Sequence, residues 1–454
     1  MSLIHGYDSK SDSEDKEPVK VVTKFSQLNH KPVNQMKKRP HLTKGELKQR
    51  KQARKSKGPW GSWSSDDEIE DEDNKDEINK IHSSLDKETD LNNHLSANAS
   101  SEDESDDKSE WSMFYGESKR FKDGCGILRP PLDIDTDLTK KNFTFKTYLP
   151  KKIKYTFPGH KNGTTSLRFL PNTGHLFLSG GSDSTIRLWD FYHDRNCIRD
   201  YNGHSKAINS LDFAPDGIKF ISSSYDKTVK VWDTERGEIL NRLKLNSGTS
   251  CCEFHPTNSN EFIVGMSNSK ILHYDMRISE NYGLVQTYDH HIGGILDVKY
   301  FQDGSKFISS SEDKTVMIWD NGINIPIKHI SDTAQYSMPV INTHPSQRHF
   351  CTQSMDNSIY TYDMRPKYKK LPNKTFKGQK SVGYGVGFTF SPDGHYICSG
   401  DIRSKVVLWD WTTSKLLKEV VIPGKLPVTQ VQWHPQETSK LICSGPSGKI
   451  HLLD

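Results

Sequence analysis

The 454-residue sequence lacks the features of several large classes of protein. None of its seven cysteines forms a CxxC pair, so the spacing of a zinc site is absent. We predict no metal site and no cofactor. No apolar run approaches the ~18 residues of a membrane-spanning helix, and the N-terminal MSLIHGYDSK has no apolar core of a signal peptide. Scattered cysteines in a chain of this size fit a reducing compartment, where thiols pack as small hydrophobes. We therefore expect no membrane partner.

Apolar residues are also scarce. Hydrophobic residues make up 33% of the chain and the mean hydropathy is −0.76, which indicates a folded part diluted by a polar, unfolded part. Residues 1–150 hold 26 Lys/Arg and 29 Asp/Glu, whereas the remainder holds 36 and 29. The two parts therefore carry opposite net charge.

Residues 1–147 are predicted to be a largely disordered N-terminal region. A basic block (31–57) has 11 basic residues and one acid, and an acidic block (66–110) has 18 acids and four lysines. Blocks of like charge repel and stay solvated, and little apolar area offsets the chain entropy. Short islands around Trp60, Trp63 and Trp111 interrupt the pattern. We interpret these tryptophans as anchors that dock into partner pockets, with chance composition as the alternative.

Residues 148–454 are periodic. Seven similar segments, each ending in Asp, include TIRLWD, TVKVWD and TVMIWD, and they lie 42 to 47 residues apart. Their last residues are Asp190, Asp233, Asp275, Asp320, Asp363, Asp410 and Asp454. A repeat of ~40–45 residues that ends in Trp-Asp is the WD-repeat signature, with one four-stranded blade per unit. We predict an all-β, seven-bladed WD-repeat β-propeller.

The last repeat ends at its third strand, at Asp454. A propeller must close its ring, because an unclosed sheet leaves an unpaired edge. We predict that residues 152–157, which precede the first repeat, supply the missing outer strand. The two ends of the domain would then meet in one blade.

The second repeat contains His204, Ser222 and Asp226, which is the composition of a hydrolase triad. Three repeats carry the same set, however, and the serine is not in a G-x-S-x-G elbow. Resemblance to WD-repeat proteins implies instead a buried hydrogen-bond chain, and we predict no catalytic residue. The three structural tetrads are His160, Ser179, Asp183 and Trp189; His204, Ser222, Asp226 and Trp232; and His291, Ser309, Asp313 and Trp319.

The other four repeats depart from this pattern. The third has Asn268 and Tyr274 in place of the aspartate and tryptophan, the fifth has Tyr362, the sixth has Arg403 in place of the aspartate, and the seventh has Leu453. Drift in a redundant scaffold and release of these positions to meet a partner are equally good explanations.

Two basic surfaces are candidates for partner or RNA binding. The first is the propeller face that carries the Gly-His loops and the aspartate turns, although lysine is also simply common in turns. Its residues are Lys161, Lys206, Lys227, Lys314, Lys380, Arg403, Lys405, Lys425 and Lys449. The second, RPKYKKLPNKTFKGQK (365–380), interleaves Tyr368 and Phe376 with Arg365, Lys367, Lys369, Lys370 and Lys374. This mixture suits single-stranded RNA, and a solvated loop is the equal alternative.

Two further patterns concern the tail. KKRP (37–40) and KQRKQARKSK (48–57) have the composition of nuclear localisation signals or RNA-backbone contacts, so we expect a nuclear protein. Serines precede acids in SDSED (11–15), SSDDE (64–68) and SEDESDD (101–107). This pattern suits acid-directed kinases, and phosphorylation there is a hypothesis.

Segments outside the general repeat consensus point to one family. They are YLPKK (148–152), GHSKAI (203–208), QSMDNSI (353–359), FKG…GYGVGFTFSPDG (376–394) and WHPQETSK (433–440), together with GPW (58–60) in the tail. These resemble the WD-repeat pre-mRNA splicing factors of the Prp-seventeen or Cdc-forty family.

That resemblance implies a nuclear, non-catalytic scaffold subunit of the spliceosome, monomeric within a large ribonucleoprotein, that acts around exon ligation, the second transesterification step. Spliceosomal proteins are the expected partners, and snRNA or pre-mRNA are candidates for the basic surfaces; no small-molecule substrate is expected. The alternative function is a WD-repeat substrate receptor of a ubiquitin ligase or a histone-tail reader. No F-box-like helical pattern occurs in the tail.

Overall fold

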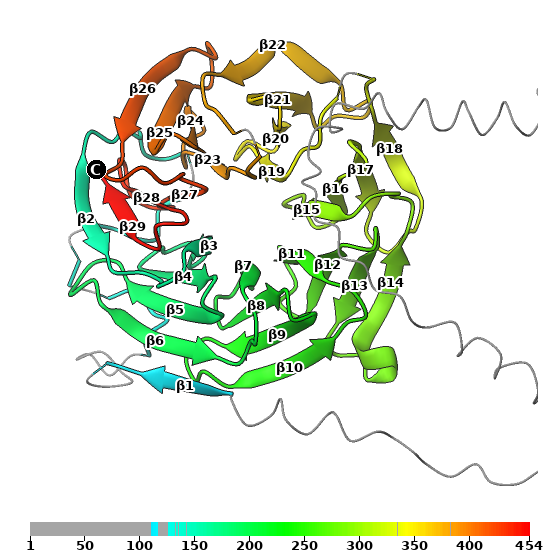
Figure 1. The fold of residues 1–454 in the computed structure, drawn as a ribbon, viewed down its shortest axis with the longest axis horizontal. Coiled ribbons are helices and arrows are strands. Elements are labelled where there is room, and N and C mark those ends of the chain that lie inside the picture. The colour runs from blue at the N-terminus through cyan, green and yellow to red at the C-terminus, as the bar shows by residue number, and fades with distance from the viewer. Residues whose placement is uncertain are drawn as a thin grey trace, which may run out of the picture. The chain divides into compact units, whose positions relative to one another are not determined.

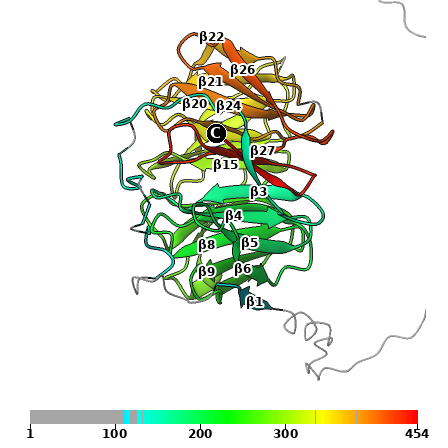
Figure 2. The same ribbon diagram turned by 90° about the vertical axis from the view of Figure 1, so that its left-hand side faces the viewer.

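The computed structural model describes residues 110–116, 126–131, 133–134, 136–141, 143–333, 335–381 and 383–454. These residues form seven antiparallel sheets around a central axis, as Figure 1 shows face-on and Figure 2 from the side. The predicted all-β, seven-bladed propeller is confirmed. Trp60, Trp63, the basic block and the acidic block up to residue 109 lie outside the described residues.

The first four blades follow one another along the chain. The strands of each blade are given from the axis outward. Blade 1 has β3 (Thr164–Phe169), β4 (Leu176–Gly181), β5 (Thr185–Asp190) and β6 (Cys197–Asn202), and blade 2 has β7 (Ile208–Phe213), β8 (Lys219–Ser224), β9 (Thr228–Asp233) and β10 (Ile239–Lys244). Blade 3 has β11 (Thr249–Phe254), β12 (Glu261–Met266), β13 (Ile271–Asp275) and β14 (Leu284–Tyr288), with the 3-10 helix η3 (Glu280–Gly283) before β14, and blade 4 has β15 (Ile295–Tyr300), β16 (Lys306–Ser311), β17 (Val316–Asp320) and β18 (Pro326–Ile330).

The last three blades complete the ring. Blade 5 has β19 (Val340–Thr343), β20 (His349–Ser354), β21 (Ser358–Asp363) and β22 (Lys370–Lys377); blade 6 has β23 (Phe388–Phe390), β24 (Tyr396–Asp401), β25 (Lys405–Asp410) and β26 (Leu416–Val421); and blade 7 has β27 (Gln430–Trp433), β28 (Leu441–Ser444), β29 (Ile450–Leu453) and β2 (Ile153–Phe157).

Blade 7 joins the two ends of the domain. Its outer strand β2 pairs antiparallel with β29, with Ile153 opposite Leu453 and Phe157 opposite Ile450. Figure 1 shows β2 beside the C-terminal strand. The segment before the first repeat therefore covers the edge that β29 would otherwise expose.

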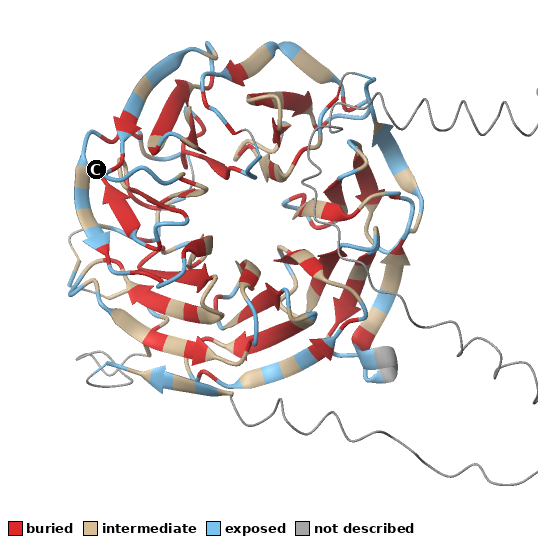
Figure 3. Cartoon of the chain, viewed as in Figure 1, coloured by how far each residue is buried: buried red, intermediate tan, exposed pale blue. Residues whose placement is uncertain are grey.

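The core lies between neighbouring blades; in blade 2, most residues of the second and third strands are buried (Figure 3). In blade 2, Phe220 stacks on Trp232 across these two strands with ring centroids 6.0 Å apart, and Tyr201 of blade 1 meets Trp232 edge-on. Such aromatic pairs supply large buried apolar areas between the blades.

Acidic side chains near the axis tie the innermost strands together. The carboxylate of Asp212 accepts a hydrogen bond from Phe254 N at 2.9 Å, that of Glu253 from Tyr300 N at 2.8 Å, and that of Asp297 from Ile341 N at 2.7 Å. Each bond links one blade to the next. The acids thus satisfy backbone donors that no strand pairing reaches.

The described residues before 148 correct the predicted boundary of the propeller. β1 (Trp111–Phe114) adds a fifth strand to blade 1 by pairing with β6. Ile127 and Leu138 are buried, and Thr147 N donates to the Asp393 carboxylate at 2.8 Å. The assignment of 1–147 as disordered is wrong for these residues, because their short apolar stretches bury surface against the propeller, which offsets the entropy of ordering them.

The described residues also bear on the other expectations from composition. Their six cysteines are unpaired thiols, of which five are buried. Within the described ranges no helix has the length and apolar character needed to cross a membrane.

Candidate functional site

The three predicted tetrads come together in blades 1, 2 and 4. In blade 2, His204 Nδ1 lies 2.8 Å from the Asp226 carboxylate, His204 Nε2 lies 2.8 Å from Ser222 Oγ, and Trp232 Nε1 donates to the same Oγ at 2.9 Å. The corresponding distances in blades 1 and 4 are 2.8 to 2.9 Å. The tetrad joins the Gly-His loop to the turn between the second and third strands.

The pKa shifts of the histidine and the aspartate indicate which group donates in the hydrogen-bond chain of the tetrad. Burial lowers the pKa of His204 despite the opposing effect of Asp226, so the ring is neutral and donates from Nδ1. Burial disfavours the Asp226 carboxylate, but hydrogen bonds from His204 and Thr228 outweigh it and lower the pKa of Asp226 well below its usual range. The same balance lowers the pKa of Asp313 to about 2.

The serine of the tetrad has no geometry for attack on a substrate. Ser222 is fully buried, and its Oγ accepts from the tryptophan while donating to His204 Nε2. A nucleophile needs its oxygen directed at an open site. The set therefore fastens two loops together by satisfying buried polar groups.

Blade 6 fastens the same two loops with an aspartate that the sequence pattern did not predict. Asp401 is buried two positions before Arg403, and its carboxylate accepts from Lys380 N at 3.2 Å and from Arg403 N at 2.7 Å. Trp409 Nε1 donates to Lys377 O at 2.9 Å in place of a serine. The signal was Gly-Asp at the end of the second strand, shifted by two residues from the consensus turn.

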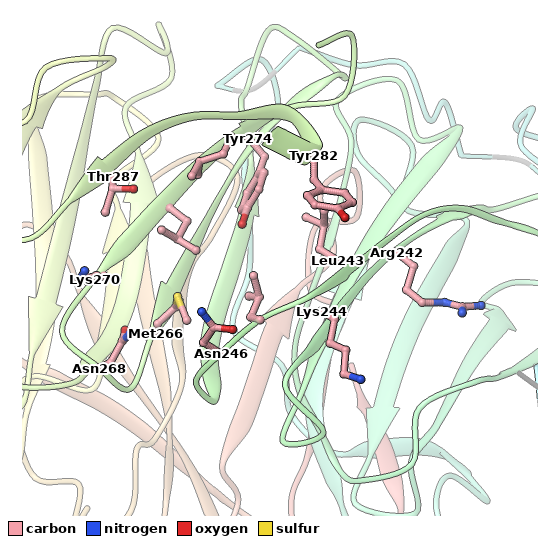
Figure 4. A pocket seen from close by; sticks show the side chains of 13 residues that line it. Arg242, Leu243, Lys244, Asn246, Met266, Asn268, Lys270, Tyr274, Tyr282 and Thr287 are labelled. Carbon is pink, nitrogen blue, oxygen red and sulfur yellow. The ribbon is translucent and has the colours of Figure 1, made fainter. Parts of the chain in front are cut away.

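Blade 3 has neither the histidine nor the aspartate. Tyr274 stacks on Phe262 with centroids 5.5 Å apart, as Trp232 does on Phe220 in blade 2. The apolar stack is thus retained without the hydrogen-bond chain. Along the outer side of this blade runs a groove of about 540 Å³ lined by Asn268, Tyr274 and residues of β10 (Figure 4). We call it the blade 3 groove.

Blades 5 and 7 close their turns in other ways. Asp356 of blade 5 accepts from Ser358 N at 3.1 Å and bonds the Tyr360 hydroxyl. In blade 7, Gly448 O accepts from His160 N at 2.9 Å, which ties the last turn to blade 1. Lys425 is exposed and Leu453 is buried in the core.

A second family of buried histidines lies at the turns between the first and second strands, on the opposite face. His255 Nε2 bonds Gly304 O of the next blade at 3.1 Å, and His344 Nε2 bonds Gly394 O at 3.0 Å. Burial lowers the pKa of His344 to about 4, so its ring is neutral. The recurring His-Pro after the first strand, as in FHP, THP and WHP, was the signal that could have found them.

Seven of the predicted basic-face residues are exposed and form no ion pair with any acidic residue in the described ranges. They are Lys161, Lys206, Lys227, Lys314, Lys380, Lys425 and Lys449. Lys405 is half-buried and pairs with Glu419 at 2.6 Å, and Arg403 pairs with Asp401 at 2.9 Å. The positive charges of the seven exposed lysines therefore lie on one face of the propeller.

The predicted RNA-binding stretch 365–380 is not an aromatic platform. Half of it, Lys370–Lys377, is β22, the outer strand of blade 5, and both Tyr368 and Phe376 are buried in the core. The two rings are therefore not available at the surface for stacking on bases. Strand alternation turns Phe376 to the inner side of β22, and Tyr368 is buried from the turn that precedes this strand.

The basic residues of the same stretch also have partners inside the protein. Lys370 lies over the Tyr360 ring at 3.4 Å from its centroid, and Lys374 over the Trp411 ring at 3.9 Å. Arg365 pairs with Asp363 at 2.6 Å. Only Lys367 and Lys369 of the five predicted residues are exposed without such a contact in the described structure.

Trp111 is the one predicted anchor that the structure describes. Its side chain is 50% exposed at the start of β1, which forms the outer edge of blade 1. The backbone of this island thus docks on the propeller itself, and the indole has surface left for a partner.

No cluster of three or more His, Cys, Asp or Glu suited to a metal occurs in the described ranges.

The architecture defines a WD-repeat β-propeller. The model of the family "WD domain, G-beta repeat" matches residues 151–190, 195–233, 282–320 and 371–410. Each range covers the outer strand of one blade and the first three strands of the next, which are blades 1, 2, 4 and 6. Among solved structures, the β-propeller domain of Cps50 (Swd1) from Myceliophteria thermophila superposes with a TM-score of 0.60 at 19% identity, over 67% of this chain and 99% of that one. This likeness shows the fold.

Relatives define the family more narrowly. Pre-mRNA-processing factor 17 of Saccharomyces cerevisiae is 54% identical over the full length of both chains, and its Mus musculus namesake is 37% identical over 73% of this chain and 57% of its own. The chain belongs to the pre-mRNA-processing factor 17 family. The resemblance drawn from the propeller segments is thereby confirmed.

Proposed function

We propose that the protein is a non-catalytic scaffold subunit of the spliceosome that is needed around exon ligation. The observation that carries this proposal is the 54% identity, from end to end, to a protein named as a pre-mRNA-processing factor. The likeness extends beyond the propeller and includes the charged tail. We also propose a nuclear location, in keeping with that role and with the basic tail motifs.

The geometry supports a scaffold. In each Ser-His-Asp set the serine and the histidine are buried and bonded to each other, so the sets stabilise loops instead of presenting a nucleophile. Seven exposed lysines on one face, which form no ion pair within the described residues, create a positive potential that attracts phosphate backbones or acidic segments. A propeller joined to an N-terminal segment that exposes Trp111 and Tyr115 can hold several partners together through linked weak contacts.

Depletion of the protein from a splicing extract tests the role. We expect free 5′ exon and lariat intermediate to accumulate, and purified full-length chain to restore ligated exons. A normal yield of ligated exons after complete depletion would exclude the proposed step. A defect before 5′ cleavage would move the role to an earlier stage.

The same depleted extract separates the alternatives. A substrate receptor of a ubiquitin ligase or a histone-tail reader would leave splicing of a naked pre-mRNA unchanged. Copurification of ubiquitin-ligase subunits or of nucleosomes with the chain would then identify which alternative applies.

A further inference from the structure

The blade 3 groove has a basic rim. Its floor is apolar and includes Leu243, Leu245 and Met266, whereas Arg242, Lys244 and Lys270 stand exposed along its edge. Figure 4 shows Lys244 and Arg242 on one side of the groove and Lys270 on the other. The rim therefore suits an acidic ligand more than an apolar one.

The described chain begins beside this rim. The carboxylate of Glu110 bonds both the Lys230 ammonium and the Arg242 guanidinium. Lys230 is almost completely buried and also donates to Gly203 O. Glu110 thus neutralises a buried cation and holds the start of β1 against β9 and β10.

The register of the strands gives the direction of the chain before Glu110. β1 runs antiparallel to β6 with Trp111 opposite Asn202, so the chain approaches from the Gly-His end of blade 2. On β10, Arg242 lies opposite Lys230 and Lys244 lies opposite Thr228, one step closer to that same end. Two residues of strand span about 7 Å. Lys244 is therefore within reach of the residues that immediately precede Glu110.

Those residues are acidic. Residues 101–109 read SEDESDDKS, with five acids and one lysine. We propose that this segment binds across the basic rim of the blade 3 groove, where it contacts Lys244 and Lys270. It contains no large apolar residue, so it covers the rim and leaves the floor unfilled.

Tethering makes this contact effective. A segment joined to its site by one or two residues has an effective concentration of order millimolar or above, so weak ion pairs suffice for occupancy. The segment would compete with any phosphate-bearing or acidic partner for the same cations. This inference concerns a contact within the chain and does not depend on the splicing role.

A peptide added in trans tests the contact on the full chain. A fluorescein-labelled peptide of residues 101–109 is titrated against the wild-type chain and against a neutralised variant with Glu102→Gln, Asp103→Asn, Glu104→Gln, Asp106→Asn and Asp107→Asn. We expect the neutralised variant to bind the peptide at least about tenfold more tightly, because its own segment 101–109 no longer carries the charges that compete with the peptide for the rim. The difference is expected to shrink as salt screens the charges.

Rim variants identify the site. In the neutralised chain, K244A with K270A is expected to abolish peptide binding, and K314A with K425A, which removes two exposed lysines from other blades, is the matched control. All four side chains are exposed, so melting temperatures are expected to stay equal. Equal peptide affinity in wild-type and neutralised chains, no binding to either, or an equal loss in the control would each overturn the proposal.

A zero-length carbodiimide crosslink on the wild-type chain gives an independent reading. Mass spectrometry is expected to find carboxylates of residues 102–107 joined to Lys244 or Lys270. Crosslinks spread evenly over exposed lysines of all blades would contradict a defined site.

Discussion

Blades 2 and 3 are neighbours with the same four-stranded topology but different fastenings. Blade 2 joins its loop to its turn through His204 and Ser222, which are buried, and Asp226, which is partly buried; His204 bonds the other two. Blade 3 keeps only the aromatic stack of Tyr274 on Phe262, and the blade 3 groove lies on its outer side. The sheet therefore forms without the tetrad, and the tetrad's contribution is to fix the loop above it.

Blade 6 adds a third arrangement. There Asp401 reaches the loop amide of Lys380 directly, without a histidine between them. The three blades show that the fold requires strand register and apolar stacking, while the polar fastening is interchangeable. Changes to the fastening are thus expected to alter stability in proportion to the buried groups left without partners.

The largest effect is expected from His204→Ala in blade 2. Removal of the ring leaves the Ser222 and Asp226 side chains without their shared partner, which is expected to lower the free energy of unfolding by about 3 kcal/mol. Urea unfolding measures the change. The matched control is Asn268→Ala at the aspartate position of blade 3, where the side chain is exposed and the expected change is within about 0.5 kcal/mol. Equal losses in the free energy of unfolding for His204→Ala and Asn268→Ala would contradict the claim that only blade 2 depends on a hydrogen-bond chain at this position.

Gly304→Ala probes the fastening on the opposite face. Gly304 has φ +71°, and an added Cβ would overlap the His255 ring. Strain and displacement of that ring are expected to cost about 2 kcal/mol. Gly322 has φ +83° with nothing within 4 Å of such a Cβ, so Gly322→Ala reports the strain alone, about 1 kcal/mol. Similar melting temperatures for the two variants would show that the His255 contact carries no weight.

Two variants of blade 6 compare the contributions of Asp401 and Arg403 to stability. Asp401→Asn is expected to cost about 1.5 kcal/mol because the carboxylate accepts from Lys380 N and Arg403 N. Arg403→Ala removes an exposed partner and is expected to cost about 0.5 kcal/mol or less. If Arg403→Ala were the more damaging in urea unfolding, the fastening assigned to Asp401 would be incorrect.

The smallest effect is expected on the pH dependence of stability, to which Asp313 of blade 4 contributes in acid. The pKa of Asp313 falls from 3.8 to about 2 in the folded protein. The folded state thus binds fewer protons, so the stabilisation is complete above pH ~3.8 and is lost as the pH falls towards 2. After allowance for solvent screening, Asp313→Asn is expected to remove about 1 kcal/mol of this acid dependence. Blade 3 has Asn268 at this position, and Asn268→Ala is expected to leave the pH profile unchanged.

Much of this arrangement could be predicted from local sequence. The spacing of Trp-Asp endings gives the blades, and His204, Ser222 and Asp226 lie in one repeat whose strand order brings them together. Pairings between distant segments could not be predicted. The docking of β1 on β6 joins Trp111 to Asn202, and nothing in the spacing of WSMF indicates that partner.

Two predictions were wrong because local composition does not show which residues the fold brings together: the surface loop at 365–380 and the missing aspartate of blade 6. The basic run at 365–380 has the composition of a loop, yet half of it is the outer strand β22, which buries Phe376, and the turn before that strand buries Tyr368. Asp401 lies two residues from the expected turn position, and only the position of the Lys380 loop amide shows that its carboxylate is still within reach.

The most direct test of the central claim is complementation of a depleted splicing extract with the Ser222→Ala chain. This change removes the hydroxyl shared by His204 and Trp232, and the assay is run below the melting temperature of the variant. If the tetrad only stabilises the blade, the folded variant restores exon ligation to the wild-type rate. A folded Ser222→Ala chain that leaves lariat intermediate unligated would contradict the account and give the serine a role in the reaction.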